Sequence, residues 1–174
     1  KSNNPKLVVR LGFIMIIGIK KSIVEEIISK RNKIKFEKIE DIISNIQIDS
    51  RQAELLSKSG AFSSFVKNRY AAVWQSALLK GEGTLLASIR NDDLSSPMLN
   101  NLSKIELCKM DYQSYGASLG EHPISLLKLK IKNKKFPASR DLKFLKDGDN
   151  VEVIGLVVSR QKPKTASGVI FLTL

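Results

Sequence analysis

The chain has 174 residues, 43% of them hydrophobic, which is enough for one medium-sized domain or two small ones with a core. Its formal net charge of +12 suits a polyanionic partner, nucleic acid first and an anionic membrane surface second. A basic proteome, or a basic face that docks on an acidic protein, would give the same charge. Cys108 and His122 are the sole residues of their kinds, which excludes an internal disulfide and argues against a structural zinc site. The lone cysteine leads us to expect an intracellular, cytoplasmic protein.

Residues 7–19 are strongly apolar. The stretch contains Arg10 and Gly12, is too short to span a bilayer, and is not followed by a small-residue cleavage site. We therefore expect it to form buried core, and we expect no membrane partner.

Four helices are predicted in the first 80 residues, each from apolar residues at helical spacing. The first covers about 20–32, and the second follows Phe36. The third begins at a cap, Asp49 or Ser50, and Gly60 suits its C-terminal end. The fourth runs from about 67 to 79. Their apolar residues are Ile23, Ile27 and Ile28; Ile39, Ile42 and Ile43; Ala53, Leu55 and Leu56; and Tyr70, Val73, Trp74, Ala77 and Leu78.

The second half has a different organisation. Glycine, proline, asparagine and aspartate interrupt residues 81–105, which predicts a linker or a long loop. Residues 106–147 form a helical connector with one helix over about 106–115. Another helix begins at Pro123, a residue suited to the first helical position, and continues to about 131.

Residues 148–174 hold two apolar, β-branched runs around a polar loop with Pro163 and Gly168, which predicts a strand, a loop and a second strand. The sequence stops inside the second run. Because a lone hairpin is marginal in water, we expect an incomplete β-domain and a chain that is one piece of something larger. Its exposed edge predicts poor solubility or pairing with another chain. Helices followed by strands predict an α+β fold.

Gly18 lies in a predicted tight turn that leads into the first long helix. Such a turn lets backbone N–H groups point outward, and the N-terminus of the next helix adds unpaired donors and a partial positive charge. We expect Gly18, Ile19, Lys20 and Lys21 to hold a phosphate of the DNA backbone without reading bases. The alternative is an ordinary turn between packed helices with its lysines in solvent.

A second unit with the same layout follows the third predicted helix. Its glycine, its serines and the basic start of the fourth helix would meet a second phosphate, so that two hairpins grip successive phosphates. The alternative is a plain hydrophobic turn. The residues assigned to this second site are Gly60, Ser63, Ser64, Lys67 and Arg69, whereas Phe62 and Phe65 are expected in the core.

The basic residues Arg160, Lys162 and Lys164 lie on or beside the loop between the two predicted strands. Such a loop on a small barrel suits single-stranded nucleic acid, and the alternative is a solvated loop. Asp147 and Asp149 flank a glycine, a pattern that is typical of a turn rather than of a metal site. The sequence contains no phosphate-binding loop, dinucleotide fingerprint or assembled catalytic set, so we assign no catalytic and no metal-binding residue.

Four stretches, residues 10–31, 36–62, 111–124 and 153–174, occur in an order and spacing that point to one family. The last contains Arg160-Gln161-Lys162-Pro163 and the run from Gly168 to Leu174. Together they resemble the C-terminal region of bacterial C-family DNA polymerases, the polymerase III α-subunit type, and most of all the error-prone branch.

The resemblance implies a tandem helix-hairpin-helix module over 7–80, a linker over 81–105, a helical connector over 106–147 and the first two strands of an incomplete OB-fold over 148–174. It implies duplex DNA as a partner, single-stranded template near the OB-fold, and a polymerase body that this chain lacks. The family's active site, with aspartates that bind a divalent metal such as magnesium, lies upstream. The resemblance therefore implies no cofactor in this chain itself.

The chain departs from the family at Lys20 and Lys21, where acidic residues are common, and this change would strengthen phosphate contact. The strands that normally follow the second OB strand are missing, and residues 13–17 are unusually apolar. We expect a non-catalytic DNA-binding fragment whose parent performs template-directed DNA synthesis across damage, in DNA repair. The alternative is a structural or interaction fragment, or a decayed gene product, without DNA binding.

Overall fold

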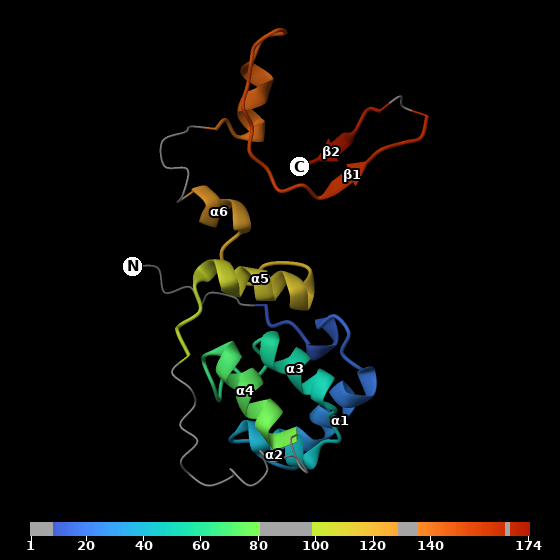
Figure 1. The fold of residues 1–174 in the computed structure, drawn as a ribbon, viewed down its shortest axis with the longest axis vertical. Helices are drawn as coiled ribbons and strands as arrows, with labels where there is room; N and C mark the ends of the chain where they lie inside the picture. Colours follow the sequence, from blue (N-terminus) through green and yellow to red (C-terminus); the bar gives the residue numbers. More distant parts are fainter. Residues whose placement is uncertain (1–8, 81–98, 129–135, 166–167) are drawn as a thin grey trace. The chain divides into compact units, whose positions relative to one another are not determined.

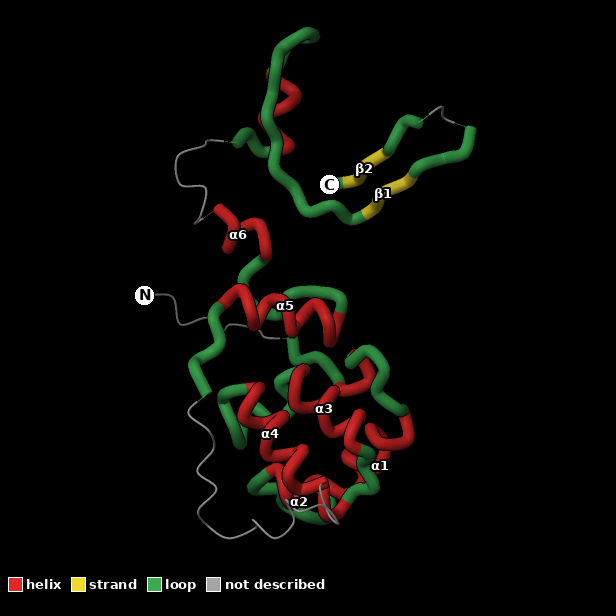
Figure 2. Tube along the Cα trace, viewed as in Figure 1, coloured by secondary structure: helices red, strands yellow, loops and turns green. Residues whose placement is uncertain are grey.

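The computed structural model describes residues 9–80, 99–128, 136–165 and 168–174. By its internal contacts the chain divides into two compact units, residues 1–119 and residues 120–174. The described part of the first unit is helical, and the second holds short helices and a two-stranded antiparallel sheet (Figures 1 and 2). The α+β expectation is confirmed, whereas the identity of the strands as part of an OB-fold stays a prediction.

The first unit contains the 3₁₀ helix η1 (Phe13–Met15) and the helices α1 (Lys21–Arg31), α2 (Ile39–Asn45), α3 (Ser50–Lys58), α4 (Arg69–Lys80) and α5 (Lys104–Tyr115). Isoleucines dominate its core, and burying each such side chain is worth roughly 1.5–3 kcal/mol. The core cluster is Ile16, Ile23, Ile27, Ile39, Ile42, Ile43, Ile46, Ile48, Ala53, Leu56, Phe62 and Ala72. The expected burial of Phe62 is confirmed, and Phe65 packs partly buried against this cluster.

The first three predicted helices are confirmed close to their expected bounds, and the carboxylate of Asp49 caps α3 by accepting the Gln52 N–H at 2.8 Å. Helix α4 begins two residues later than expected because the Asn68 side chain accepts the Tyr70 N–H at 2.9 Å, as a cap does. Its buried face consists of Ala71, Ala72 and Ser76. Small residues there let α4 approach α3 closely enough for the Ser57 and Ser76 hydroxyls to lie 3.1 Å apart.

The expectation that residues 7–19 form buried core is wrong for most of the described stretch. Ile16 is buried and Phe13 and Ile19 are half-buried, because a three-residue 3₁₀ helix followed by a turn presents only one face to the core. Residues 7 and 8 lie outside the described part. The exposed apolar residues are Val9, Leu11, Ile14, Met15 and Ile17.

Helix α5 begins at Lys104, inside the stretch expected to be linker, because Ser103 and Glu106 form a reciprocal capping box. The Ser103 hydroxyl and N–H donate to Glu106 and lower the pKa of its carboxyl group. The rest of the expected linker, up to residue 98, lies outside the described residues. Backbone contacts fix the end of α5: Ser114 O accepts the Ile17 N–H at 2.8 Å.

The second unit contains α6 (Pro123–Lys128), the 3₁₀ helix η3 (Ser139–Phe144) and the strands β1 (Ser159–Gln161) and β2 (Phe171–Thr173). The predicted helix start at Pro123 is confirmed, and its expected end lies outside the described residues. The strands pair antiparallel with Arg160 opposite Leu172, but both are shorter than the apolar runs that predicted them. In the described ranges, no helix has the length and apolar character needed to cross a membrane.

Candidate nucleic-acid interface

The first hairpin, residues 16–22, joins η1 to α1. Gly18 has φ = 82°, a left-handed conformation that glycine adopts at little cost and other residues avoid. The Ile19 N–H donates to Ile16 O at 3.1 Å and closes the turn. The exposed Gly18 therefore lies at the tip of a tight turn that leads directly into a helix of 11 residues.

A single side chain from α3 holds this hairpin. The Gln52 side-chain oxygen accepts the Lys20 N–H at 2.8 Å, and its amide nitrogen donates to Gly18 O at 3.1 Å. Gln52 is 2% exposed, so the side chain that makes both bonds is fixed in the core. This buried amide fixes the backbone on both sides of Ile19.

Three backbone donors of the first hairpin remain open. No acceptor for the N–H groups of Gly18, Lys21 and Ser22 is found within the described ranges. The last two belong to the first turn of α1, where the helix dipole adds a partial positive charge. Open donors beside a helix N-terminus form an arrangement that accommodates a phosphate.

Both lysines of the first hairpin have carboxylate partners. Lys20 Nζ lies 2.7 Å from Asp49 Oδ2, and Lys21 Nζ lies 3.6 Å from Glu25 Oε1. The hydrogen bond from Lys20, followed by the Gln52 N–H, lowers the pKa of the Asp49 carboxyl group. Both lysines stay exposed, but part of their charge is neutralised locally.

The sequence analysis missed Gln52 and the second role of Asp49. The spacing of four residues on a helix predicts the pair of Lys21 and Glu25. By contrast, 29 residues separate Lys20 from Asp49 and 32 separate Lys20 from Gln52. No local pattern signals such contacts.

The second hairpin, residues 59–68, joins α3 to α4. Gly60 has φ = 80°, and a Cβ atom added to it would lie 2.9 Å from Arg69 Nε. Ser63, Ser64 and Lys67 are exposed, as a phosphate contact requires. Neither serine hydroxyl has a hydrogen-bond partner within the described part of the chain.

Arg69 differs from the other residues assigned to this hairpin because its guanidinium faces inward. Nη1 donates to Asp111 Oδ1 at 2.7 Å and to Lys58 O at 3.2 Å, and the side chain is only 15% exposed. Asp111 is buried on α5, where its Oδ2 also accepts the Leu119 N–H at 2.8 Å. Arg69 thus joins α4 to α5 and to the end of α3.

An open groove of about 700 Å³ lies against the second hairpin. The segment before η1, the end of α1 and the end of α5 complete its walls. Its lining includes three arginines and, among the described residues, no carboxylate. It is lined by Val9, Arg10, Leu11, Gly12, Phe13, Ile28, Arg31, Ser59, Gly60, Ala61, Ser63, Ser64, Arg69, Tyr115 and Leu119.

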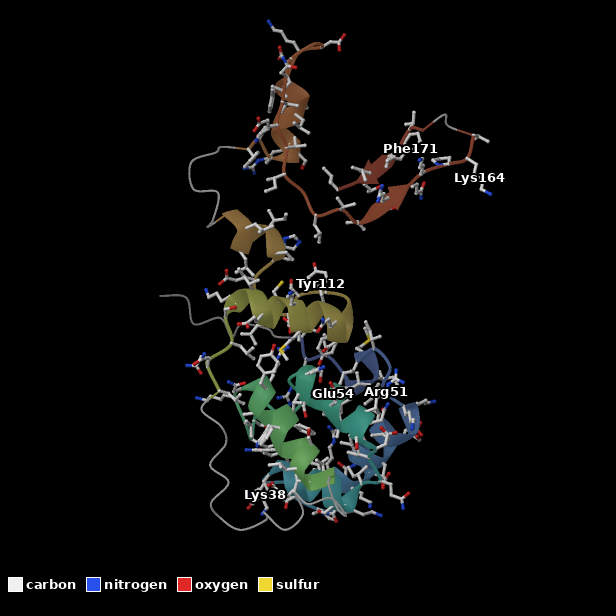
Figure 3. All side chains as sticks on the ribbon, in the orientation of Figure 1. Lys38, Arg51, Glu54, Tyr112, Lys164 and Phe171 are labelled. Atoms are coloured by element: carbon white, nitrogen blue, oxygen red, sulfur yellow. The ribbon has the colours of Figure 1, made fainter. Side chains whose placement is uncertain are left out.

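The remaining assigned residues belong to the second unit. Arg160 lies on β1 and Lys162 directly follows it, and both side chains are exposed. Figure 3 shows Lys164 on the loop beyond β1 and Phe171 on β2. The basic loop is thus accessible within its own unit.

Among the described residues, no three His, Cys, Asp or Glu side chains group in a way that could hold a metal ion. Asp147 and Asp149 belong to an exposed turn in which Gly148 has φ = 90° and Asp149 Oδ2 accepts the Lys146 N–H at 2.8 Å. Cys108 is buried, and burial, followed by the nearby Asp111, raises the pKa of its thiol, which disfavours the reactive thiolate.

Comparisons with known proteins agree with this architecture. A family model described as a helix-hairpin-helix motif matches residues 2–72, which include both hairpins. The error-prone DNA polymerase of Pseudomonas savastanoi pv. phaseolicola is 34% identical over 168 residues, which cover 97% of this chain and 16% of that protein. The error-prone DNA polymerase of Pseudomonas fluorescens strain Pf-5 is 36% identical over 165 residues, 95% of this chain and 16% of that protein.

The corresponding protein of Xanthomonas campestris pv. campestris is 33% identical over 169 residues, with 95% of this chain and 15% of that protein covered. The chain therefore spans about 16% of the length of the curated relatives it matches. The resemblance expected from the sequence is confirmed: the chain is related, over nearly its whole length, to a segment of the error-prone DNA polymerases and carries a helix-hairpin-helix motif.

Proposed function

We propose that this chain is a non-catalytic, DNA-contacting segment of an error-prone DNA polymerase, and that its first hairpin binds the DNA backbone irrespective of sequence. The observation that carries the proposal is the set of open N–H groups of Gly18, Lys21 and Ser22, which Gln52 holds in place. Phosphate contacts of this kind position a duplex and confer affinity without reading bases. The helix-hairpin-helix match and the net charge of +12 support the same assignment.

In this proposal the polymerase reaction belongs to the rest of a longer, cytoplasmic protein. That part would hold the divalent metal, magnesium, and perform template-directed DNA synthesis across damage. Ser63, Ser64 and Lys67 would contact a second phosphate, and Arg160 and Lys162 would contact single-stranded template. Purified chain with metal and nucleotides is expected to give no primer extension.

The hairpin can be tested by changing one position in two ways. Lys21→Gln removes a charge and keeps the N–H, whereas Lys21→Pro removes both. Proline fits there because residue 21 is the first of α1 and Lys20 is extended, with φ = −79° and ψ = 130°. A comparison of the two variants isolates the backbone donor from the charge.

The measurement is fluorescence anisotropy of a labelled primer–template duplex at two salt concentrations. We expect duplex affinity to fall steeply as the salt concentration rises. It should fall modestly in Lys21→Gln and by about a further tenfold in Lys21→Pro, which is the value of a hydrogen bond to a charged group. Lys38→Gln is the matched control, since it removes one exposed charge at the start of α2 (Figure 3). Equal affinities for the Gln and Pro variants, both folded, would refute the backbone contact.

A second function has its own supporting observation. Ile14, Met15 and Ile17 are 53%, 55% and 55% exposed beside Gly18, and exposed apolar clusters commonly mark protein contacts. In that case the first hairpin docks on the polymerase body, and the carboxylate partners of Lys20 and Lys21 are consistent with this role. Absence of duplex binding by folded chain at low salt would favour docking over DNA contact.

A further inference from the structure

The groove beside the second hairpin carries positive charge that no described carboxylate offsets. In the groove described above, Arg69 is neutralised by the buried Asp111. Arg10 and Arg31 are exposed and have no carboxylate partner within the described residues. Both line the groove, whose remaining charge is therefore positive.

The same groove offers hydrogen-bond donors next to these arginines. The hydroxyls of Ser63 and Ser64 are exposed, and the Ser64 N–H has no acceptor among the residues described. Arginine presents a planar fork of donors that matches phosphate oxygens, and hydroxyl and backbone donors complete such sites. The polar part of the groove lining therefore suits a phosphate.

The groove also has apolar lining residues. Leu11, Ile28 and Leu119 line the groove and are 40%, 40% and 48% exposed. Phe13 and Tyr115 also contribute, and both are half-buried. A volume of about 700 Å³ falls within the range of small-molecule sites, so the groove has room for a planar group beside the phosphate.

We propose that this groove binds one nucleotide of single-stranded DNA, with its phosphate on Arg10, Arg31, Ser63 and Ser64 and its base against the apolar lining residues. A phosphate alone would leave the apolar residues uncovered, and an apolar ligand would leave two arginines unpaired. The choice of a nucleotide over other aromatic phosphates rests on the proposed function. The phosphate contact does not rest on the proposed function. Neither the phosphate contact nor the base contact involves the first hairpin.

The test is a set of ¹H–¹⁵N NMR titrations of the whole chain with dAMP, inorganic phosphate and a five-residue oligo(dA). We expect dAMP to shift the resonances of Gly60, Ser63 and Ser64 and to leave Gly18 unchanged. Phosphate should shift the same resonances more weakly, and the oligonucleotide should bind more tightly than dAMP. Equal affinity for phosphate and dAMP would overturn the base contact. An oligonucleotide that leaves the groove unshifted would overturn the assignment to a DNA strand.

The arginines are tested with Arg31→Gln and Arg10→Gln, and Lys38→Gln serves as a charge-matched control outside the groove. Each arginine variant should weaken dAMP binding about tenfold, as expected for a lost charged hydrogen bond, and the control should not. Arg31→Lys, which keeps the charge, should retain part of the affinity and shows that the fold is intact. Unchanged dAMP affinity in the Gln variants would refute the site.

Duplex binding measured with Lys21→Pro is a separate readout, so failure of the groove and failure of the first hairpin are distinguishable.

Discussion

Arg69 and Asp111, 42 residues apart in the sequence, form an ion pair with a 2.7 Å separation in which the carboxylate is 4% exposed. The pair connects α4 to α5 across a stretch of chain that carries no regular pattern. The guanidinium also donates to Lys58 O, so the end of α3 is held by the same contact. A residue expected at the DNA surface thus has a structural role in the first unit.

Asp111→Ala should destabilise the first unit strongly, because it leaves a largely buried guanidinium without its counter-charge. We expect a loss of about 3 kcal/mol in the free energy of unfolding, measured by urea denaturation. Glu37→Ala is the control, since Glu37 Oε1 lies 3.0 Å from Lys35 Nζ in an exposed pair of the same unit and its loss should change stability by less than about 0.5 kcal/mol. Similar losses in both variants would contradict the role assigned to Asp111.

Gly60→Ala should destabilise the second hairpin for two reasons. Its φ of 80° is unfavourable for alanine, and the new Cβ would lie 2.9 Å from Arg69 Nε. We expect a loss of about 1–2 kcal/mol in thermal or urea unfolding. Gly120→Ala, which would meet no atom within 4 Å, should have little effect, and an equal loss there would rule out this explanation.

The stability of the α3 N-terminus should depend on acid pH through Asp49. Its pKa is lowered in the folded chain, so its contribution is present above the ordinary value of 3.8 and is lost as the pH falls below that value. Asp49→Asn keeps a helix cap but does not titrate. The drop in Tm between about pH 5 and about pH 2.5 should therefore be smaller in the variant. A drop as large as in the unmodified chain would assign the acid sensitivity to other groups.

The same substitution should raise DNA affinity at neutral pH. Asp49→Asn removes the carboxylate that pairs with Lys20 Nζ at 2.7 Å and thereby leaves that ammonium available to a phosphate. We expect duplex affinity to rise about two- to fivefold at low salt, since an exposed ion pair is weak. Glu37→Gln removes an equivalent exposed carboxylate, the partner of Lys35, and is the control. Unchanged affinity for Asp49→Asn would mean that Lys20 does not reach the DNA.

The first three helices and the cap at Asp49 could be predicted from the sequence because they depend on local spacing, whereas the caps at Asn68 and Ser103 were missed. Isoleucines three and four residues apart, Asp49 before α3 and Pro123 at the start of α6 needed no tertiary information. The exposure of Ile14, Met15 and Ile17 could not be predicted, because composition alone does not show how few residues of a short turn face the core.

The candidate nucleic-acid interface could likewise be predicted only in part. The glycine turns at Gly18 and Gly60 were predicted from sequence, and both glycines have a left-handed backbone. The inward position of Arg69 and the groove beside Arg10 and Arg31 depend on contacts between residues distant in the sequence. The folded arrangement is needed to show that distant carboxylates neutralise Lys20 and Arg69.

The bidentate contact of Gln52 has a consequence for binding. Because a buried side chain already restricts the backbone on both sides of Ile19, the hairpin loses its conformational freedom when α3 folds rather than when a phosphate arrives. Its open donors are therefore preorganised, and an ion that meets them encounters a rigid surface. Affinity at the hairpin would then vary with the integrity of α3, even where α3 itself touches no ligand.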